Sequence, residues 1–247
     1  MKKLYEKSEL AFALAWIAVY CAAESSAYPL SEAIGVESSA AAILNVCLTL
    51  FLFGWVWKSG LSKRYGLCKV ALPARRFLWY VPLMAIASRN LWNGAALSRP
   101  VLDTVCYGIS MFCVGFLEEL LIRGFLFRAL AKDGVKSAVV ISSVTFGLAH
   151  VLNLFNGRGM ELMENLYQVT YAIAVGFLFA IVLTRGGSLW PCIAAHSGID
   201  VASAFANDAG LTPQKNWIFS ALELAILVSY ALWLAKTLPV REDFREG

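Results

Sequence analysis

Long apolar stretches alternate with short polar segments along nearly the whole chain. A helix needs about 20 mostly apolar residues to cross a bilayer, and eight stretches approach or exceed that length. They are Leu10–Leu30, Ser39–Trp57, Phe77–Trp92, Val101–Phe127, Ser137–Phe155, Leu166–Leu183, Leu189–Phe205 and Trp217–Ala235. The third is the weakest, because it is short and ends in polar residues. The pattern predicts an all-α fold, a polytopic membrane helical bundle with about eight transmembrane helices.

The composition agrees with a membrane protein. Hydrophobic residues make up 59% of the 247 residues and charged residues 15%, against about 45–50% and about 25% in soluble domains. This balance excludes a secreted disulfide scaffold, a disordered chain and a fibrous repeat. The net charge of +4 comes without a dense basic face, so we expect no nucleic-acid partner. The six cysteines form no CxxC pair and fit apolar packing.

Basic residues orient the predicted bundle. If the N-terminus is cytoplasmic, sixteen of the 21 Lys and Arg residues fall on the cytoplasmic side. An even number of spans returns the C-terminus to the same side. We therefore expect an integral protein of the plasma membrane of a bacterium, with both termini cytoplasmic. Membrane lipids are the expected partners of the basic connector Lys58–Arg76.

Ionisable residues inside membrane spans are expensive, so each is a candidate functional residue. The chain places eight there: Glu24, Glu118, Glu119, Arg123, His150, His196, Asp200 and Glu223. Both histidines of the chain are among them. Most lie within 101–205, which we take as the core that carries the motifs. The other divisions are the N-terminal helices, 1–100, and the C-terminal helix with its cytoplasmic tail, 206–247.

Helical spacing gives these residues partners. Glu119 and Arg123 are four apart and predict an ion pair, whereas Glu118 points about 100° away. Glu118 is therefore available as an acid or base. Glu24 and Glu223 are expected to have structural roles.

The two histidines also have neighbours at helical spacing. Phe146 and His150 share one helix face, and His196 and Asp200 share another, so that Asp200 can hold the imidazole in one tautomer. Alone, each pair fits a structural role. Because the groups come at overlapping depths on three helices, we expect one cavity, open to the cytoplasmic half of the bilayer.

Together these residues form an ordered set of motifs. In chain order they are Glu118-Glu119-x-x-x-Arg123, Phe146-x-x-x-His150 and His196-x-x-x-Asp200. The set resembles the signature of the CAAX protease and bacteriocin-processing membrane proteins, which include type II CAAX endopeptidases and lysostaphin-resistance proteins. The region from Gly115 to Asp200 carries the resemblance.

The resemblance implies an all-helical intramembrane endopeptidase. It implies that Glu118 and His150 activate a water molecule that attacks a peptide bond. Glu119, Arg123 and Phe146 would then support the site structurally.

The third motif departs from part of the family. The resemblance implies that His196 and Asp200 stabilise the oxyanion or assist in binding water. The prenyl-protein proteases of the family have asparagine where this chain has Asp200. An ionised aspartate would repel an oxyanion, so Asp200 either carries a proton or acts by orienting His196.

Two alternatives remain open. Glu118, His150 and His196 are possible zinc ligands, although their spacing is not that of a known zinc motif and we expect no cofactor. The chain also fits a non-proteolytic membrane protein, either an immunity or regulatory factor that binds a toxin or membrane partner, or a small transporter with a proton relay. For a protease, the substrate is a peptide or protein that enters from the membrane or the cytoplasmic side.

Overall fold

The computed structural model describes residues 1–155 and 161–244, which fold almost entirely into helices. The α-helices are α1 (Lys2–Lys7), α2 (Glu9–Ile34), α3 (Ser39–Lys58), α4 (Val81–Ala87), α5 (Val101–Glu118), α6 (Phe127–Ala131), α7 (Val135–Ala149), α8 (Leu162–Gly186), α9 (Trp190–Ser203) and α10 (Pro213–Thr237). Short 3₁₀ helices are η1 (Ala74–Tyr80), η2 (Arg89–Leu91), η4 (His150–Leu154) and η5 (Glu242–Phe244), and η3 (Glu119–Leu126) is a π-helix. No strand forms among the described residues, so the predicted all-helical fold is confirmed.

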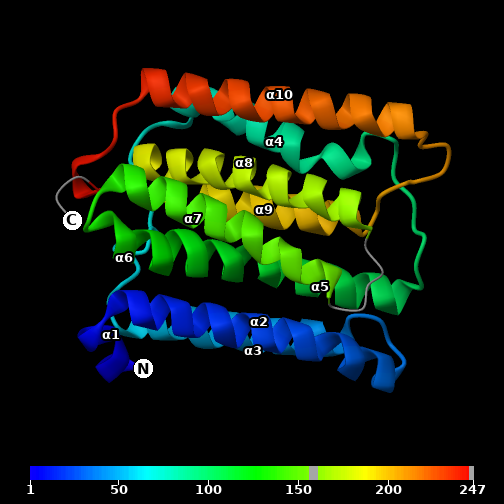
Figure 1. Cartoon of the computed structure of the whole chain (residues 1–247), viewed down its shortest axis with the longest axis horizontal. Helices are drawn as coiled ribbons and strands as arrows, with labels where there is room; N and C mark the ends of the chain where they lie inside the picture. Colours follow the sequence, from blue (N-terminus) through cyan, green and yellow to red (C-terminus); the bar gives the residue numbers. More distant parts are fainter. Residues whose placement is uncertain (156–160, 245–247) are drawn as a thin grey trace.

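The helices run side by side along one axis and stack in layers (Figure 1). α2 and α3 form one side of the bundle, α5 packs on α3, and α9 packs on α5. On the other side α7 and α10 both pack on α8, and α10 also contacts α4. The continuous path through α5, η3 and α6 lies at the centre, where every residue from Glu119 to Phe127 is buried.

Six helices among the described residues are long and apolar enough to cross a membrane. They are α2, α3, α5 continued through η3 and α6, α7 continued through η4, α8 and α10. The other two expected spans are short helices, so the expected count of about eight is approximate. Left-handed backbone at Leu78, Trp79 and Tyr80 delays the start of α4, which has 7 residues. α9 has 14 residues, about 21 Å of helix, which is less than the thickness of a bilayer core.

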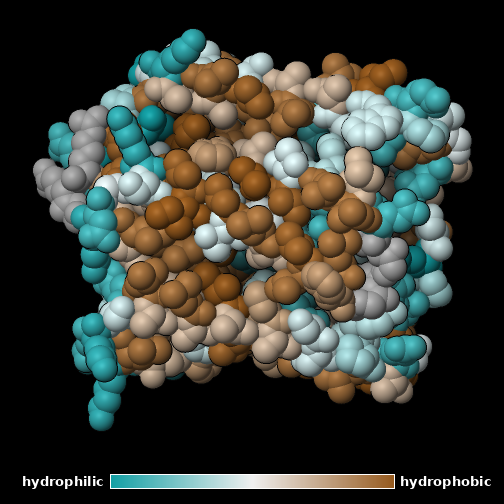
Figure 2. Space-filling model, in the orientation of Figure 1, coloured by the Kyte–Doolittle hydropathy of each residue, from teal (hydrophilic) through white to brown (hydrophobic). Residues whose placement is uncertain are grey.

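Charge is distributed unequally between the two ends of the bundle. Figure 2 shows a hydrophobic band with hydrophilic residues at both ends. We call one end the basic end; it comprises residues 1–8, 58–76, 128–136, 185–189 and 236–244. It holds fifteen described Lys and Arg residues, whereas Arg89, Arg99 and Lys215 lie in the opposite half. Arg158 and Arg245, which the sequence-based count includes, lie outside the described residues.

A glycine allows α5 and α9 to approach closely. A Cβ atom added to Gly115 would stand 2.5 Å from the backbone nitrogen of Ser197. The Ser197 hydroxyl donates a hydrogen bond to the carbonyl oxygen of Phe112 at 2.9 Å, which ties the same two helices together. Small residues serve such close contacts in membrane proteins, where lipid supplies no hydrophobic driving force. This contact places His196, the neighbour of Ser197, against the centre of the bundle.

We expect Gly115→Ala to lower the free energy of unfolding by about 1–3 kcal/mol, because the added methyl forces α5 and α9 apart. Gly108→Ala is the matched control on the same helix, since a Cβ atom there meets nothing within 4 Å. The control should be neutral, or stabilising by up to about 1 kcal/mol through helix propensity. Thermal unfolding of the purified protein in detergent measures both. An unchanged Tm for Gly115→Ala would contradict the close approach.

Candidate active site

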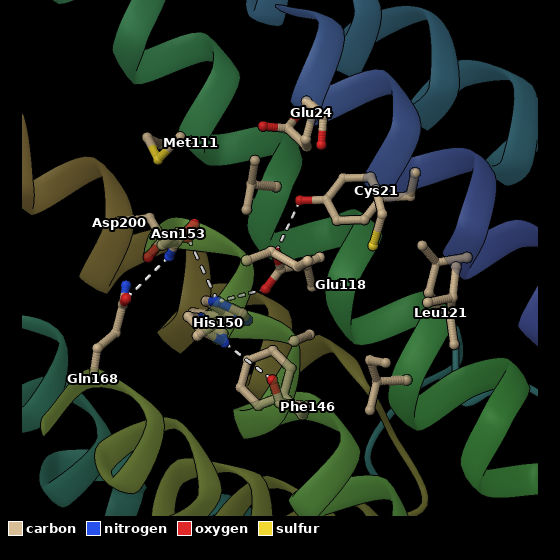
Figure 3. A pocket seen from close by; sticks show the side chains of 18 residues that line it. Cys21, Glu24, Met111, Glu118, Leu121, Phe146, His150, Asn153, Gln168 and Asp200 are labelled. Atoms are coloured by element: carbon tan, nitrogen blue, oxygen red, sulfur yellow. Dashed lines mark hydrogen bonds and ion pairs between the residues drawn. The ribbon is translucent and has the colours of Figure 1, made fainter. Parts of the chain in front are cut away.

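A cavity of about 210 Å³ lies between α2, α5, α7, η4, α8 and α9. Four residues predicted from the motifs line it: Glu118, His150, His196 and Asp200. Figure 3 shows the side chains of Glu118, His150 and Asp200 converging on this space from separate helices. The structure thus brings all three motifs to one cavity.

A change of helix type separates the two consecutive glutamates. The α-helical part of this span ends at Glu118, and the π-helix begins at Glu119. Glu118 faces the cavity, whereas Glu119 is 0% exposed. π-helical segments are rare and are frequent at functional sites. The two carboxylates therefore have different surroundings, as the helical spacing predicted.

Glu119 and Arg123 form the predicted ion pair. The Arg123 Nη1 atom lies 2.9 Å from Glu119 Oε1, and neither side chain is accessible to solvent. The Arg123 guanidinium also lies over the ring of Phe146, 4.1 Å from its centroid. A buried charge that loses its partner is strongly destabilising, so each residue of the pair depends on the other.

The same glutamate also holds His196. The His196 Nδ1 atom lies 2.9 Å from Glu119 Oε1. Because Glu119 is paired with Arg123 as a carboxylate, it accepts this hydrogen bond and Nδ1 donates. Sequence spacing predicted Asp200 as the partner of the imidazole, and the structure adds Glu119 as the partner of the other ring nitrogen. The role assigned to Glu119 therefore extends to positioning His196.

The other imidazole nitrogen of His196 faces the cavity carboxylates. Its Nε2 atom lies 3.5 Å from Asp200 Oδ2 and 3.6 Å from Glu118 Oε2. Three acceptors cannot face one another without a hydrogen between them. A proton is therefore shared among Nε2 and the two carboxylates.

His150 has a defined tautomer. Its Nδ1 atom lies 3.0 Å from the carbonyl oxygen of Phe146, and a carbonyl oxygen can only accept. Nδ1 therefore carries the hydrogen, and neutral His150 presents Nε2 as an acceptor. Asn165 fixes this turn of the chain by donating to the His150 carbonyl oxygen at 2.8 Å.

Phe146 lies between the two histidines. Its ring meets that of His150 edge-on at 5.1 Å and that of His196 edge-on at 5.7 Å. Since Arg123 covers the ring of Phe146, one aromatic side chain contacts the ion pair and both imidazoles. The resemblance implied structural support from Phe146, and that role stays a prediction.

Sequence reasoning missed Tyr20. Its hydroxyl donates a hydrogen bond to Glu118 Oε1 at 2.9 Å, from α2 across to α5. The available signal was the spacing of Tyr20 and Glu24, which are four apart on one helix face and both line the cavity. That spacing identifies a polar face but does not identify the helix against which it packs.

Glu223 belongs to a different polar cluster. The Tyr171 hydroxyl donates to its Oε1 atom at 2.6 Å, and Arg89 Nε lies 3.7 Å from its Oε2 atom. These contacts join α8, α10 and η2 and agree with the structural role expected for Glu223.

The cavity opens on a different side from the one expected. Its more exposed lining residues, Ser25 and Leu152, come from the part of α2 beyond its midpoint and from η4 after the end of α7. Both positions lie away from the basic end (Figure 1). The sequence predicted an opening in the cytoplasmic half, which is the half nearer the basic end. That prediction requires α9 to begin at the membrane surface, but Leu189, which precedes α9, is fully buried and donates to the carbonyl oxygen of Gly66.

Among the described residues, no group of three or more His, Cys, Asp and Glu side chains is arranged to hold a metal ion. This applies to Glu118, His150 and His196, the set that the sequence offered.

We expect Arg123→Met to cost roughly 3–5 kcal/mol of stability, because it leaves the Glu119 carboxylate buried without its partner. The double variant Glu119→Gln/Arg123→Met removes both charges and should recover part of this loss. Thermal unfolding of the two variants and of Glu119→Gln gives the complete cycle. A Tm for Arg123→Met equal to that of the wild type would contradict a buried ion pair.

The matches to known proteins agree with these observations. Residues 100–202 match the family model described as Type II CAAX prenyl endopeptidase Rce1-like. No match to the chain was found among curated proteins or among solved structures. The matched residues include all three motifs, and with the six apolar helices they make the chain an integral membrane protein. Over residues 100–202 the chain is similar to the Rce1-like type II CAAX prenyl endopeptidase family, a family of membrane proteases.

Proposed function

We propose that this protein is an intramembrane endopeptidase that hydrolyses a peptide bond with a water molecule activated by Glu118 and His150. The observation that carries the proposal is the convergence of two carboxylates and two imidazoles on one cavity inside a bundle of apolar helices. Such groups are costly within a membrane and are retained there for function. The family match supports a protease.

Glu118 acts as the general base. It takes a proton from water while the water oxygen attacks the carbonyl carbon of the scissile bond, and the carbonyl electron pair moves to oxygen. The tetrahedral intermediate then breaks its C–N bond. Glu118 returns the proton to the leaving nitrogen, so the products are a free carboxyl end and a free amino end.

Two contacts prepare Glu118 for this role. Tyr20 donates to Oε1, and Oε2 is directed toward His196. His150 presents the Nε2 lone pair, so it accepts the second hydrogen of the water and orients its oxygen. Preorganised contacts of this kind place the water without a reorganisation cost at the moment of reaction.

His196 stabilises the developing oxyanion. We assign the shared proton to its Nε2 atom, which makes that atom a donor toward the cavity. Asp200 lies 3.5 Å from Nε2, so an ionised Asp200 holds the imidazolium in place and does not contact the oxyanion itself. This explains how an aspartate can stand where the prenyl-protein proteases have asparagine. We further propose that no cofactor takes part and that the substrate is a peptide or protein in contact with membrane lipids.

Glu118→Gln and His150→Ala should each lower proteolysis by at least about 100-fold, since each removes a group that activates water. Both residues line the cavity, so the variants should remain folded and inserted. The measurement is a comparison of protein N-termini, by mass spectrometry, in membranes of cells that carry the wild type or each variant. N-termini produced by the protease should disappear in both variants.

Glu32→Gln is the matched control, because it removes an exposed carboxylate of α2 outside the cavity. It should give the wild-type set of N-termini. If Glu118→Gln also gives that set, hydrolysis is excluded and a non-proteolytic binding role takes its place. Loss of the N-termini after exhaustive chelation would contradict a reaction without metal.

A further inference from the structure

A second cavity, of about 210 Å³, lies at the basic end of the bundle. It shares no lining residue with the cavity that brings the three motifs together. The connector after α3, the end of α6 and the segment η5 contribute its walls. Its lining residues are Arg64, Arg128, Ala131, Lys132, Asp243 and Phe244. The proposed hydrolysis uses none of them, so this cavity needs a separate explanation.

The segment after α10 forms one side of this cavity. The chain turns back along the basic end (Figure 1), where the backbone N–H of Arg241 donates to the carbonyl oxygen of Thr184 at 3.0 Å. Phe244 is 1% exposed and packs on Phe127 of α6, with ring centroids 5.9 Å apart. The Arg128 guanidinium lies over the ring of Phe244, 3.5 Å from its centroid. This packing fixes the guanidinium of Arg128 at the cavity wall.

Two cations of the cavity share a single carboxylate. Arg64 Nη2 lies 2.7 Å from Glu9 Oε2, and Lys132 Nζ lies 3.3 Å from the same oxygen. Both hydrogen bonds from Arg64 to Glu9 come from Nη2, which leaves the other N–H groups of the guanidinium out of this contact. Because one carboxylate neutralises one cation, one positive charge remains on this group.

A third cation of the cavity also shares its carboxylate. Arg128 Nη1 donates to the backbone carbonyl oxygen of Asp243 at 3.0 Å, whereas Nη2 lies 3.7 Å from Asp243 Oδ2, beyond hydrogen-bond distance. Asp243 Oδ1 accepts instead from Arg241 Nε at 2.9 Å. Two cations again share one carboxylate, so a second positive charge remains. We call the whole group the cation cluster: Arg64, Arg128, Lys132 and Arg241 with Glu9 and Asp243.

This excess of positive charge is unfavourable unless an anion balances it. Arg128 and Lys132 are four apart across the end of α6, a spacing at which like charges repel. The side chain of Arg128 is 11% exposed, so water and salt screen its charge poorly. Guanidinium groups present several N–H donors that match the oxygens of a phosphate group. A phosphate group in the cavity would therefore offset the charge of the cation cluster.

The cavity has room for such a group. An apolar cavity of about 150 Å³ binds benzene, and a phosphate group has fewer non-hydrogen atoms than benzene. The volume at the basic end is larger, about 210 Å³. The cavity can thus hold a phosphate group together with water molecules.

The cavity also lies at the level where the apolar part of the bundle ends. Ala131, which lines it, is the last residue of the membrane span that begins at Val101. Trp57 and Trp79, beside the same end of the bundle, are 68% and 67% exposed. Tryptophan is enriched at the level of the lipid headgroups. Phospholipids supply phosphate groups at this level, and basic pockets between membrane helices bind such headgroups.

We propose that the cavity at the basic end binds the phosphate group of an anionic phospholipid, with Arg64, Arg128 and Lys132 as its contacts. An anionic headgroup offsets the charge of the cation cluster, whereas a zwitterionic headgroup brings a cation of its own. The bound lipid joins the connector after α3, the end of α6 and η5, and so stabilises the folded protein. The site does not depend on the proposed hydrolysis.

Thermal unfolding of the purified protein in detergent tests this site. Phosphatidylglycerol is the anionic probe, phosphatidylcholine is the zwitterionic control, and inorganic phosphate represents a free anion. At a hundred-fold excess over Kd we expect phosphatidylglycerol to raise the Tm by roughly 5–10 °C, with saturation. Phosphatidylcholine and inorganic phosphate should give less than half of this shift.

Two double variants separate the cavity from a general attraction of the basic end for anions. Arg64→Gln/Lys132→Gln removes two exposed cations of the cavity and leaves two cations with two carboxylates, so the lipid-induced shift should be lost. Lys63→Gln/Lys136→Gln is the matched control, because it removes the same charge from exposed positions that do not line the cavity. It should keep the shift of the wild type.

A third variant applies if the first double variant does not fold. Lys132 is 48% exposed, so Lys132→Gln is a mild change. It should raise the concentration of phosphatidylglycerol at half-maximal shift about 5-fold, as expected for the loss of one basic residue. An unchanged concentration in this variant would contradict the site.

Several results would overturn the proposal. They are a wild type that phosphatidylglycerol does not stabilise, an equal shift with phosphatidylcholine, and an equal loss of the shift in both double variants. Retention of the full shift in Arg64→Gln/Lys132→Gln would overturn it as well. If inorganic phosphate alone gives the full shift and the lipid adds nothing, the cavity binds free phosphate and the assignment to a lipid is wrong.

Discussion

The buried ion pair between Glu119 and Arg123 is the interaction on which the arrangement of the site depends. A single oxygen, Glu119 Oε1, accepts from Arg123 and from His196, each at 2.9 Å. Arg123 in turn covers Phe146, whose ring contacts both imidazoles. Lipid and packed side chains exclude water from this region, so a charge that lost its partner here would have a high free energy. The contacts among these groups therefore fix the positions of η3, α7 and α9 relative to one another.

The two adjacent carboxylates, Glu118 and Glu119, have different partners. Glu119 holds Arg123 and His196 through one oxygen, Oε1, whereas Glu118 faces the cavity with Tyr20 on one oxygen. The transition from α-helix to π-helix lies between them. A carboxylate in a buried ion pair and a carboxylate that faces the cavity can thus occupy consecutive positions.

Much of this could be predicted from the sequence, because the relevant interactions are local. The pairs Glu119–Arg123, Phe146–His150 and His196–Asp200 follow from a spacing of four on a helix, and the structure places each pair together. Contacts between helices distant in sequence could not be predicted in this way. Tyr20 meets Glu118 because α2 packs on η3, and Glu119 meets His196 because Gly115 allows α9 to approach. The side of the opening was missed since it depends on the offset of α9 along the bundle axis.

The central claim is that Glu118 and His150 act on the same water molecule, which makes their contributions to the rate non-additive. The most direct test is a double-mutant cycle on the cleavage rate of a substrate identified from the N-terminal comparison. Glu118→Asp and His150→Gln shift or replace the two groups while keeping hydrogen-bonding side chains at both positions. We expect the double variant to cleave at nearly the rate of the slower single variant. A rate equal to the product of the two separate losses would show that the residues act independently and would contradict a shared water.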